Sequence, residues 1–388
     1  MLNQFKRYGM QEIIRQTNNR ERQLKLRMQS AAGAVTVFNG RTYDYFSGCG
    51  YLGLQTHPDV IGAAVEALKL YGVSTATSRG SYGEHTLYDE LEREACVFFG
   101  AERSLYFASG YLGASILVQG CAHSYEHIFI DSAAHYSLWD AAQATGRPIT
   151  PFRHRCPEHL EESLKGELLP GERPLILSDG VFPISGEIAP LPEYIALTKQ
   201  YCGLVCVDDA HAAGVLGEHG RGTLEHFGIN GACFRSCATL SKALGGYGGI
   251  ICGDAAWIDE VERRSSACVG ASPPPLPIAA ASARALMIAR TEPGLRKRLR
   301  ENTAMARRGF VRLGWKLEDT PVPVICLPAR DGTQLQQIKN RLFEDGIAVS
   351  YVRSYTSTPA GGALRVAVFA THTTEQIEHL LSAFSRAA

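Results

Sequence analysis

A single lysine, Lys242, stands in a segment that could do covalent chemistry. It lies in TLSKALGGYGG, between small residues and a run of glycines, and no carboxylate stands near it in the sequence. A lysine in a turn is most often a solvated charge. An amine beside glycines that let the backbone approach a ligand closely could instead act as a nucleophile. The segment alone leaves both interpretations open.

Other residues capable of chemistry follow short apolar runs. Gly110 and Tyr111 come after SLYFAS, at the expected start of a helix whose free N–H groups would suit a phosphate. His135 follows HIFIDS, and its ring could stack on a flat ligand. Asp208 ends LVCVD, and His211 comes shortly after it. Each alone also has a structural explanation, as a turn, a core histidine or a helix cap.

One cofactor needs all of these groups together, and it is pyridoxal phosphate. Its aldehyde bonds to a lysine, its phosphate favours a helix N-terminus, and its ring nitrogen needs a carboxylate to stay protonated. Ligands of open α/β sheets bind beyond the carboxyl ends of the strands, where these residues are expected. The order of positions 110, 135, 208, 211 and 242 therefore predicts a pyridoxal phosphate site.

The elements that would position these residues alternate between strand and helix. Apolar runs such as HIFIDS, PLILSDG and GLVCVDDA are separated by helical patterns such as YSLWDAAQAT and LPEYIALTKQY. This alternation predicts parallel βαβ units and a sheet covered on both faces. The turn ASPPPLP (271–277) breaks the rhythm, and further short strands separated by helices follow it.

We therefore expect an α/β chain of three parts. Residues 1–44 are predicted to be an N-terminal helical arm, 45–284 a large cofactor-binding domain with a mostly parallel sheet, and 285–388 a small C-terminal α+β domain. Residues 1–28 carry seven Lys and Arg residues against two Glu residues. We interpret them as a solvated arm packed on a partner subunit, with contact to an anionic membrane surface as the alternative.

Charge and cysteine content exclude several classes of protein. The 39 Lys and Arg residues balance 39 Asp and Glu residues, which argues against a nucleic-acid partner. Eleven cysteines, no apolar signal core near Met1 and no run of about 18 apolar residues predict a cytoplasmic protein with free thiols. The pairs Cys202/Cys206 and Cys233/Cys237 lack the spacing of structural zinc ligands, so no metal is expected.

Seven motifs give the chain a family resemblance. They are YLGL (51–54), SGYLGA (109–114), DSAAHYSLWDAA (131–142), SDGVFPISGEIAPL (178–191), VDDAHAAGVLGEHGRG (207–222), TLSKALG (239–245) and LRVAVFATHTTEQI (364–377). From about Tyr45 to Leu381 the chain resembles the α-oxoamine synthases, which are pyridoxal phosphate enzymes of fold type I. Some segments are similar to the serine palmitoyltransferase branch and others to the 8-amino-7-oxononanoate synthase branch. DDAH with TLSK downstream is the most specific part of the resemblance.

The resemblance implies a reaction and roles around the cofactor ring. The family condenses an amino acid with an acyl thioester, carried by CoA or by an acyl carrier protein, and loses carbon dioxide to give an α-aminoketone. Lys242 would bond to the cofactor and Asp208 would pair with its ring nitrogen. His135 would stack on the ring, and His211 would contact the ring oxygen.

The resemblance also implies contacts to the phosphate and the substrate. Thr239 and the backbone of Gly110 and Tyr111 would hold the phosphate, helped by Ser272 from the other subunit of a homodimer. Arg365 would bind the carboxylate of the amino acid.

Three positions depart from the family pattern, mostly on the substrate side. Cys49 stands where the family has an asparagine that helps to hold the carboxylate, Tyr88 where it has a histidine, and Pro183 where it has a serine. Two other hypotheses therefore stay open: another pyridoxal phosphate carbanion enzyme of aldol or transaldol type, or a non-catalytic partner subunit. Lys242 argues against the second of these. The amino acid, the acyl chain length and the thioester carrier also stay open.

Overall fold

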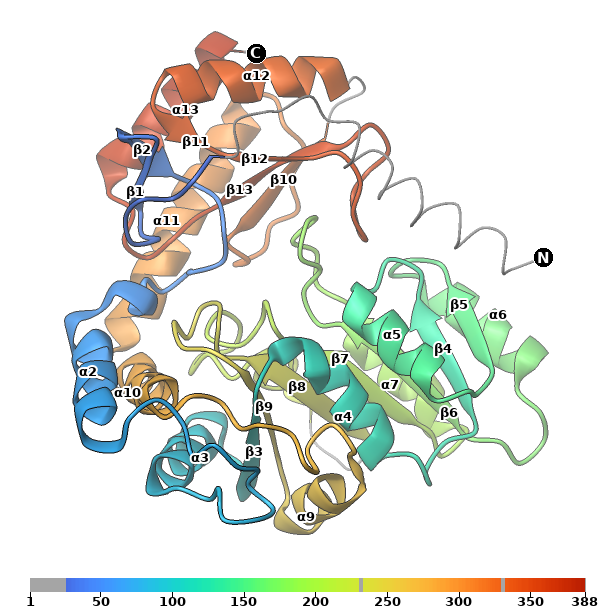
Figure 1. The fold of residues 1–388 in the computed structure, drawn as a ribbon. Helices are drawn as coiled ribbons and strands as arrows, with labels where there is room; N and C mark the ends of the chain where they lie inside the picture. The colour runs from blue at the N-terminus through green and yellow to red at the C-terminus, as the bar shows by residue number, and fades with distance from the viewer. Residues whose placement is uncertain (1–25, 230–232, 329–331, 388) are drawn as a thin grey trace.

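The computed structural model describes residues 26–229, 233–328 and 332–387 and is built around a seven-stranded sheet (Figure 1). In spatial order its strands are β3 (Arg103–Phe107), β9 (Gly249–Gly253), β8 (Phe234–Thr239), β7 (Leu204–Asp208), β6 (Pro174–Asp179), β4 (His127–Asp131) and β5 (Ile149–Phe152). The strands from β8 to β5 pair in parallel, and β9 runs antiparallel to β8 and β3. The predicted mostly parallel α/β sheet is confirmed.

Helices cover both faces of this sheet, as its apolar strands require. They are α4 (Gly113–Gly120), α5 (Tyr136–Ala144), α6 (Pro157–Glu167), α7 (Leu191–Lys199) and α9 (Ala255–Arg264). Ile128 and Ile130 of β4 share one core cluster with α4, α5 and α9, whereas Phe129 shares another with α6 and α7. Successive residues of one strand thus fill opposite cores. The short η2 (Gly110–Leu112) and α8 (Thr223–His226) follow β3 and β7.

Three helices form a separate layer beside the antiparallel edge of the sheet. They are α2 (Pro58–Tyr71), which follows η1 (Leu54–Thr56), α3 (Thr86–Phe99) and the alanine-rich α10 (Leu276–Thr291). Because its small side chains allow close approach, α10 packs against both α2 and α3. The division expected between residues 284 and 285 falls inside α10 and stays a prediction.

Two three-stranded sheets lie in the upper part of Figure 1. One contains β1 (Val35–Phe38), β2 (Arg41–Tyr45) and β11 (Ile347–Ala348), and the other contains β10 (Val324–Pro328), β13 (Ala363–Ala367) and β12 (Ser350–Val352). They pack with α11 (Pro293–Arg312), α12 (Gly332–Glu344) and α13 (Thr374–Ala387). Within the described residues, no helix is both long and apolar enough to span a bilayer.

The N-terminal part differs from the expected helical arm wherever the structure describes it. Residues 35–45 form the β1–β2 hairpin instead, and β2 pairs in parallel with β11. The turn is Asn39-Gly40, and both residues have positive φ angles, 49° and 78°. This turn suits the twist of a hairpin, and the flanking β-branched and aromatic residues favour strands. The remainder of the predicted arm, residues 1–25, lies outside the described residues.

Candidate active site

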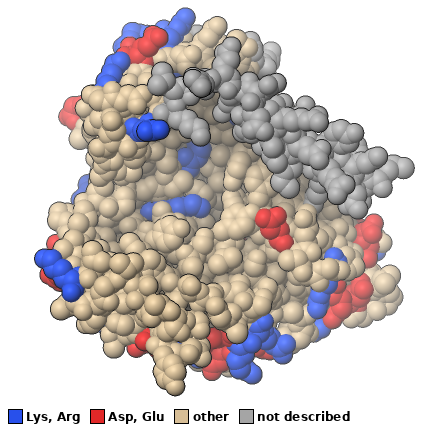
Figure 2. All heavy atoms as spheres, in the orientation of Figure 1, with Lys and Arg blue, Asp and Glu red and all other residues tan. Residues whose placement is uncertain are grey.

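The carboxyl ends of the parallel strands open on a cavity of about 250 Å³. Seven residues that the sequence singles out line it: Gly110, Tyr111, His135, Asp208, His211, Thr239 and Lys242. Cys49, Ser272 and Arg365 are not part of this lining. Figure 2 shows Lys or Arg atoms inside the hollow between the upper and lower parts of the molecule. The fold therefore gathers most of the predicted site residues at one edge of the sheet.

One end of the cavity is crowded with hydroxyl groups. Thr239 Oγ1 donates to the Gly248 carbonyl at 3.0 Å and lies 2.7 Å from Ser241 Oγ. Gly110 packs directly on Thr239, since a Cβ added at Gly110 would lie 2.6 Å from Thr239 Oγ1. Ser109 caps η2 by accepting the N–H of Tyr111 at 3.3 Å. We did not single out Ser241 from the sequence, although a hydroxyl residue directly before Lys242 was a usable signal.

Lys242 lies half-buried in the turn after β8, at the wall of the cavity. Among the described residues, no carboxylate lies within ion-pair distance of its amine. Gly245 closes the turn with a φ of 65°, and a Cβ there would lie 2.5 Å from the Gln55 nitrogen. The glycine after the lysine is thus explained by close packing of the turn against η1.

Two carboxylates, Asp179 and Asp208, end adjacent strands in register. Asp208 Oδ1 accepts the N–H of Ala210 at 2.9 Å, and Asp179 Oδ2 accepts the N–H of His135 at 2.8 Å. Burial and the neighbouring charge of Asp208 raise the pKa of Asp179 well above its usual range. We did not select Asp179 as a site residue, although SDG ends its strand in the way that VDD ends the next.

Asp209 faces away from the cavity and serves the fold. Its carboxylate accepts both the N–H and the hydroxyl of Thr223, at 2.9 and 2.8 Å, at the start of α8. Burial raises the pKa of Asp209 to about 7. Of the two consecutive aspartates, Asp208 lines the cavity and Asp209 has the structural role of a cap.

A chain of hydrogen bonds links His211 to Arg365 on β13. Tyr51 Oη lies 2.8 Å from His211 Nδ1 and accepts from Arg365 Nη2 at 3.2 Å. Burial and the cations of Lys242 and Arg365 lower the pKa of His211 well below its usual range. The hydrogen bond between the neutral ring and the Tyr51 hydroxyl fixes His211 against the cavity.

The buried guanidinium of Arg365 contacts two of the three positions that depart from the family pattern, Pro183 and Cys49. Its Nε donates to the Pro183 carbonyl at 2.8 Å, and Nη1 donates to the Gly48 carbonyl at 2.9 Å. Nη2 also lies 3.6 Å from Cys49 Sγ. Arg365 and Cys49, both predicted to lie on the substrate side, are neighbours, and most of the guanidinium N–H groups are already engaged by the chain.

The third departure, Tyr88, lies beside the segment that carries Ser272. The buried Tyr88 hydroxyl donates to the Pro274 carbonyl at 2.7 Å, and the Arg79 guanidinium lies 5.2 Å from the centre of its ring. Ser272 is exposed and lines a second cavity, outside the one at Lys242. Its predicted contact with a partner's phosphate stays a prediction.

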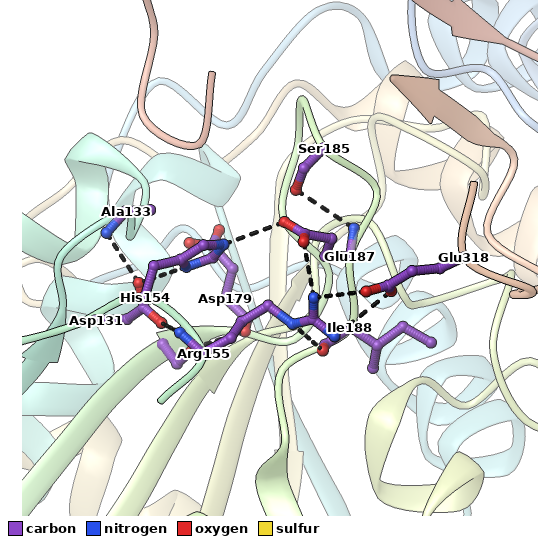
Figure 3. Close-up of polar contacts among 10 residues, drawn as sticks. Asp131, Ala133, His154, Arg155, Asp179, Ser185, Glu187, Ile188 and Glu318 are labelled. Atoms are coloured by element: carbon purple, nitrogen blue, oxygen red, sulfur yellow. Dashed lines mark hydrogen bonds and ion pairs between the residues drawn. The ribbon is translucent and has the colours of Figure 1, made fainter. Parts of the chain in front are cut away.

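A polar cluster adjoins the site and reaches the C-terminal part of the chain (Figure 3). Asp131 ends β4 and accepts from His154 Nδ1 at 2.8 Å, and His154 Nε2 donates to Glu187 at 3.2 Å. Arg155 bridges Glu187 at 2.7 Å and Glu318, which follows α11, at 3.0 Å. These contacts connect the loop after β5, the loop after β6 and the segment before β10.

The electrostatics of the cluster favour the charged forms. The carboxylates of Asp131 and Glu187 outweigh burial and raise the pKa of His154 to about 9. The hydrogen bond from His154 lowers the pKa of Glu187 to about 2. Within the described residues, no group of three or more His, Cys, Asp or Glu side chains is arranged to hold a metal ion.

Comparisons with known proteins give the same family as the sequence motifs. The family model for class I and II aminotransferases matches residues 48–384. The 8-amino-7-oxononanoate synthase of Methylococcus capsulatus is 34% identical over 361 residues, which are 93% of each chain. The chain belongs to the α-oxoamine synthase family. A second member, 8-amino-7-oxononanoate synthase 1 of Bacillus subtilis, is 31% identical over 93% of this chain and 92% of its own.

Solved structures place the chain near another branch of the α-oxoamine synthases. Serine palmitoyltransferase of Sphingomonas wittichii superimposes with a TM-score of 0.88 at 28% identity, over 98% of this chain and 95% of that one. A further serine palmitoyltransferase structure, which contains pyridoxal phosphate, has a TM-score of 0.89 at 26% identity, over 100% of this chain and 98% of that one. The resemblance to two branches of the family is therefore confirmed.

Removing the charged histidine of the polar cluster should change how stability depends on pH. Because the pKa of His154 is raised from 6.5 to about 9, its stabilisation is complete below pH 6.5 and is lost as the pH rises through 9. His154→Gln should lower the free energy of unfolding by about 2 kcal/mol at pH 6 and by much less near pH 10. Denaturant titration at both pH values measures the difference.

The control is His123→Gln. His123 is half-exposed, and its Nδ1 lies 3.5 Å from the carboxylate of Glu260. It should cost less than about 1 kcal/mol at either pH. Equal losses at pH 6 and pH 10 in the His154 variant would contradict the assignment.

Proposed function

We propose that the chain catalyses the pyridoxal phosphate-dependent condensation of an α-amino acid with an acyl thioester. The reaction joins the amino-acid Cα to the acyl carbon, releases the thiol and carbon dioxide, and yields an α-aminoketone. The observation that carries this proposal is the cavity that brings Lys242, with no carboxylate partner among the described residues, together with Asp208 and His135. Relatives named 8-amino-7-oxononanoate synthase and serine palmitoyltransferase support it.

The donor set of the cavity fits pyridoxal phosphate. Gly110 leaves room at Thr239 that a Cβ would fill, and the hydroxyls of Thr239 and Ser241 gather there with the start of η2. We assign the phosphate to this end, held also by the Gly110 and Tyr111 backbone. When bound, the cofactor supplies an aldehyde for a lysine and a ring that withdraws electrons from the amino-acid Cα.

The side chains of the cavity divide the remaining work. Asp208, held by the Ala210 N–H, would keep a proton on the ring nitrogen. The Lys242 amine, which lines the same cavity, would remove the proton from the amino-acid Cα. His135 would cover the ring and exclude water, and His211, held by Tyr51, would contact the ring oxygen.

Arg365 would hold the carboxylate of the amino acid. Its contacts to the Pro183 and Gly48 carbonyls are short, at 2.8 and 2.9 Å, whereas the thiol of Cys49 lies at 3.6 Å. A thiol is a weak acceptor, so the Nη2 edge at Cys49 is the edge that a carboxylate can displace most easily. A charged hydrogen bond to a carboxylate would replace a weak contact there.

Chemical trapping tests the cofactor assignment, and product analysis tests the reaction. Borohydride reduction of the protein loaded with pyridoxal phosphate should fix the pyridoxyl group on Lys242, as peptide mass mapping would show. With acyl-CoA and the twenty amino acids in turn, at least one amino acid should give release of free thiol and carbon dioxide in equal amounts. Lys242→Ala should lose both the label and the turnover, whereas Lys165→Ala, on the surface of α6, should lose neither.

A label on another lysine would refute the assignment of Lys242. Cα chemistry without any thiol release, from CoA or from an acyl carrier protein, would refute the condensation and indicate an aldol or transaldol type of enzyme.

Filling the space at Gly110 should weaken cofactor binding. In Gly110→Ala the new methyl would lie 2.6 Å from Thr239 Oγ1 and 2.7 Å from its Cβ, so the phosphate end must distort. The dissociation constant for pyridoxal phosphate, measured by absorbance titration, should rise at least about tenfold, equivalent to about 1.4 kcal/mol. Gly166→Ala in α6 has no atom within 4 Å of the added Cβ and should bind normally. Equal affinity in the two variants would contradict the assignment of the phosphate end.

We also propose a homodimer with shared sites. Helix α2 and Val73, two residues beyond its end, expose several apolar side chains: Ile61, Val65, Leu68, Leu70, Tyr71 and Val73. A group of exposed apolar side chains on one helix is typical of an interface, and Ser272 lies on a segment that α3 anchors through Tyr88. A second copy of the chain would cover this surface and receive Ser272 at its phosphate.

Mixing two inactive variants tests the shared site. Lys242→Ala removes the amine of one site, and Ser272→Glu would place a negative charge against the partner's phosphate. A hybrid dimer should regain one intact site of its two, because the intact Lys242 and the intact Ser272 then meet in the same site. Activity after subunit exchange, with sedimentation to verify the dimer, measures this, and a fully active monomer would refute it.

A further inference from the structure

The imidazole of His135 is held at both of its nitrogens. Nδ1 accepts the backbone N–H of Ser137 at 3.2 Å and lies 2.8 Å from the Ser137 hydroxyl. A backbone N–H can only donate, so Nδ1 carries no hydrogen. Burial also lowers the pKa of His135, which favours the neutral ring. The one hydrogen of the neutral ring therefore sits on Nε2.

The partner of Nε2 comes from the C-terminal part of the chain. Tyr355 Oη lies 2.9 Å from His135 Nε2, and since Nε2 carries the hydrogen, the phenol oxygen accepts. Tyr355 lies in the loop 353–362 between β12 and β13, the loop that runs down towards the large sheet in Figure 1. Its ring packs edge-on against Tyr136, with centroids 5.2 Å apart.

We propose that Tyr355 is a positioning residue for His135, which it holds in one orientation from the loop 353–362 by accepting the Nε2 hydrogen. The ring of His135 lines the cavity, and Ser137 restrains only its Nδ1 side. Without an acceptor at Nε2, the ring could turn about its Cβ–Cγ bond. The contact also makes a complete site depend on docking of the loop 353–362.

The chain does not need the Tyr355 hydroxyl for its core. Tyr355 is half-buried, it belongs to none of the core clusters, and among the described residues its hydroxyl makes a hydrogen bond only to His135. Tyr136 belongs to the same group of rings, and among the described residues its hydroxyl makes no hydrogen bond. The two tyrosines form a matched pair, because replacing either by phenylalanine removes one oxygen from the same aromatic group.

The test compares Tyr355→Phe with Tyr136→Phe by NMR of protein containing ¹⁵N-labelled histidine, with and without pyridoxal phosphate. His135→Gln assigns the His135 signals by their loss. In the parent and in Tyr136→Phe, Nδ1 should be unprotonated and the Nε2 hydrogen should exchange slowly with water. In Tyr355→Phe that hydrogen should exchange at least tenfold faster. Equal exchange in all three proteins, or the same acceleration in Tyr136→Phe, would overturn the proposal.

A kinetic arm rests on the proposed function. With an amino acid and an acyl thioester that give turnover, Tyr355→Phe should lower kcat about tenfold and leave the KM for the amino acid within twofold, while Tyr136→Phe keeps both. A change in KM alone would overturn the positioning role in catalysis. The NMR arm needs no turnover, so failure of the condensation reaction and failure of the Tyr355 contact would be told apart.

Discussion

The arrangement of the rest of the site depends on two buried carboxylates that end neighbouring strands. The parallel register of β6 and β7 places Asp179 beside Asp208, where both lie away from bulk water. Two buried negative charges side by side repel each other. Three features offset this repulsion: the raised pKa of Asp179, the backbone N–H that His135 donates to it, and the Lys242 amine on the same cavity wall. Because His135 stands at the start of α5, its hydrogen bond to Asp179 also holds α5 against the sheet.

The C-terminal part of the chain supplies what the large sheet lacks. The large sheet brings acidic and hydroxyl groups to its carboxyl edge, and β13 adds the Arg365 guanidinium, bound to carbonyls of two separate loops. The loop before β13 adds the phenol of Tyr355, and Glu318 adds an ion pair to Arg155. The backbone of Arg155 is left-handed, with φ of 51°. A residue other than glycine keeps this conformation when its surroundings hold it there. The junction is therefore maintained at several independent points.

Much of the site was predictable because it obeys a local rule. Residues that follow an apolar strand of a parallel sheet meet at one edge, so Asp208, His135 and Lys242 could be grouped from their order alone. The same rule applied to SDG would have included Asp179. The Asn-Gly turn of the first hairpin was also readable, but the basic residues before it favoured a helix. Tyr355 could not be found in this way, because its contact joins residues 220 positions apart in the chain. The contact proposed for Ser272 joins two chains, so the structure of one chain does not contain it.

Arg365 lies on a strand whose register cannot change, whereas the loop before that strand can change in length. β13 is the central strand of its sheet, with Arg365 opposite Cys326 on one side and Ser350 on the other. A slip of one residue would turn the guanidinium to the opposite face, so an insertion within this strand would remove Arg365 from its contacts with the Pro183 and Gly48 carbonyls. The loop 353–362, which directly precedes the strand, has no such register to keep, and its proposed role requires only that Tyr355 still reaches His135. Descendants of this chain, natural or engineered, can therefore change the length and the residues of that loop on either side of Tyr355 while the proposed carboxylate anchor remains in place.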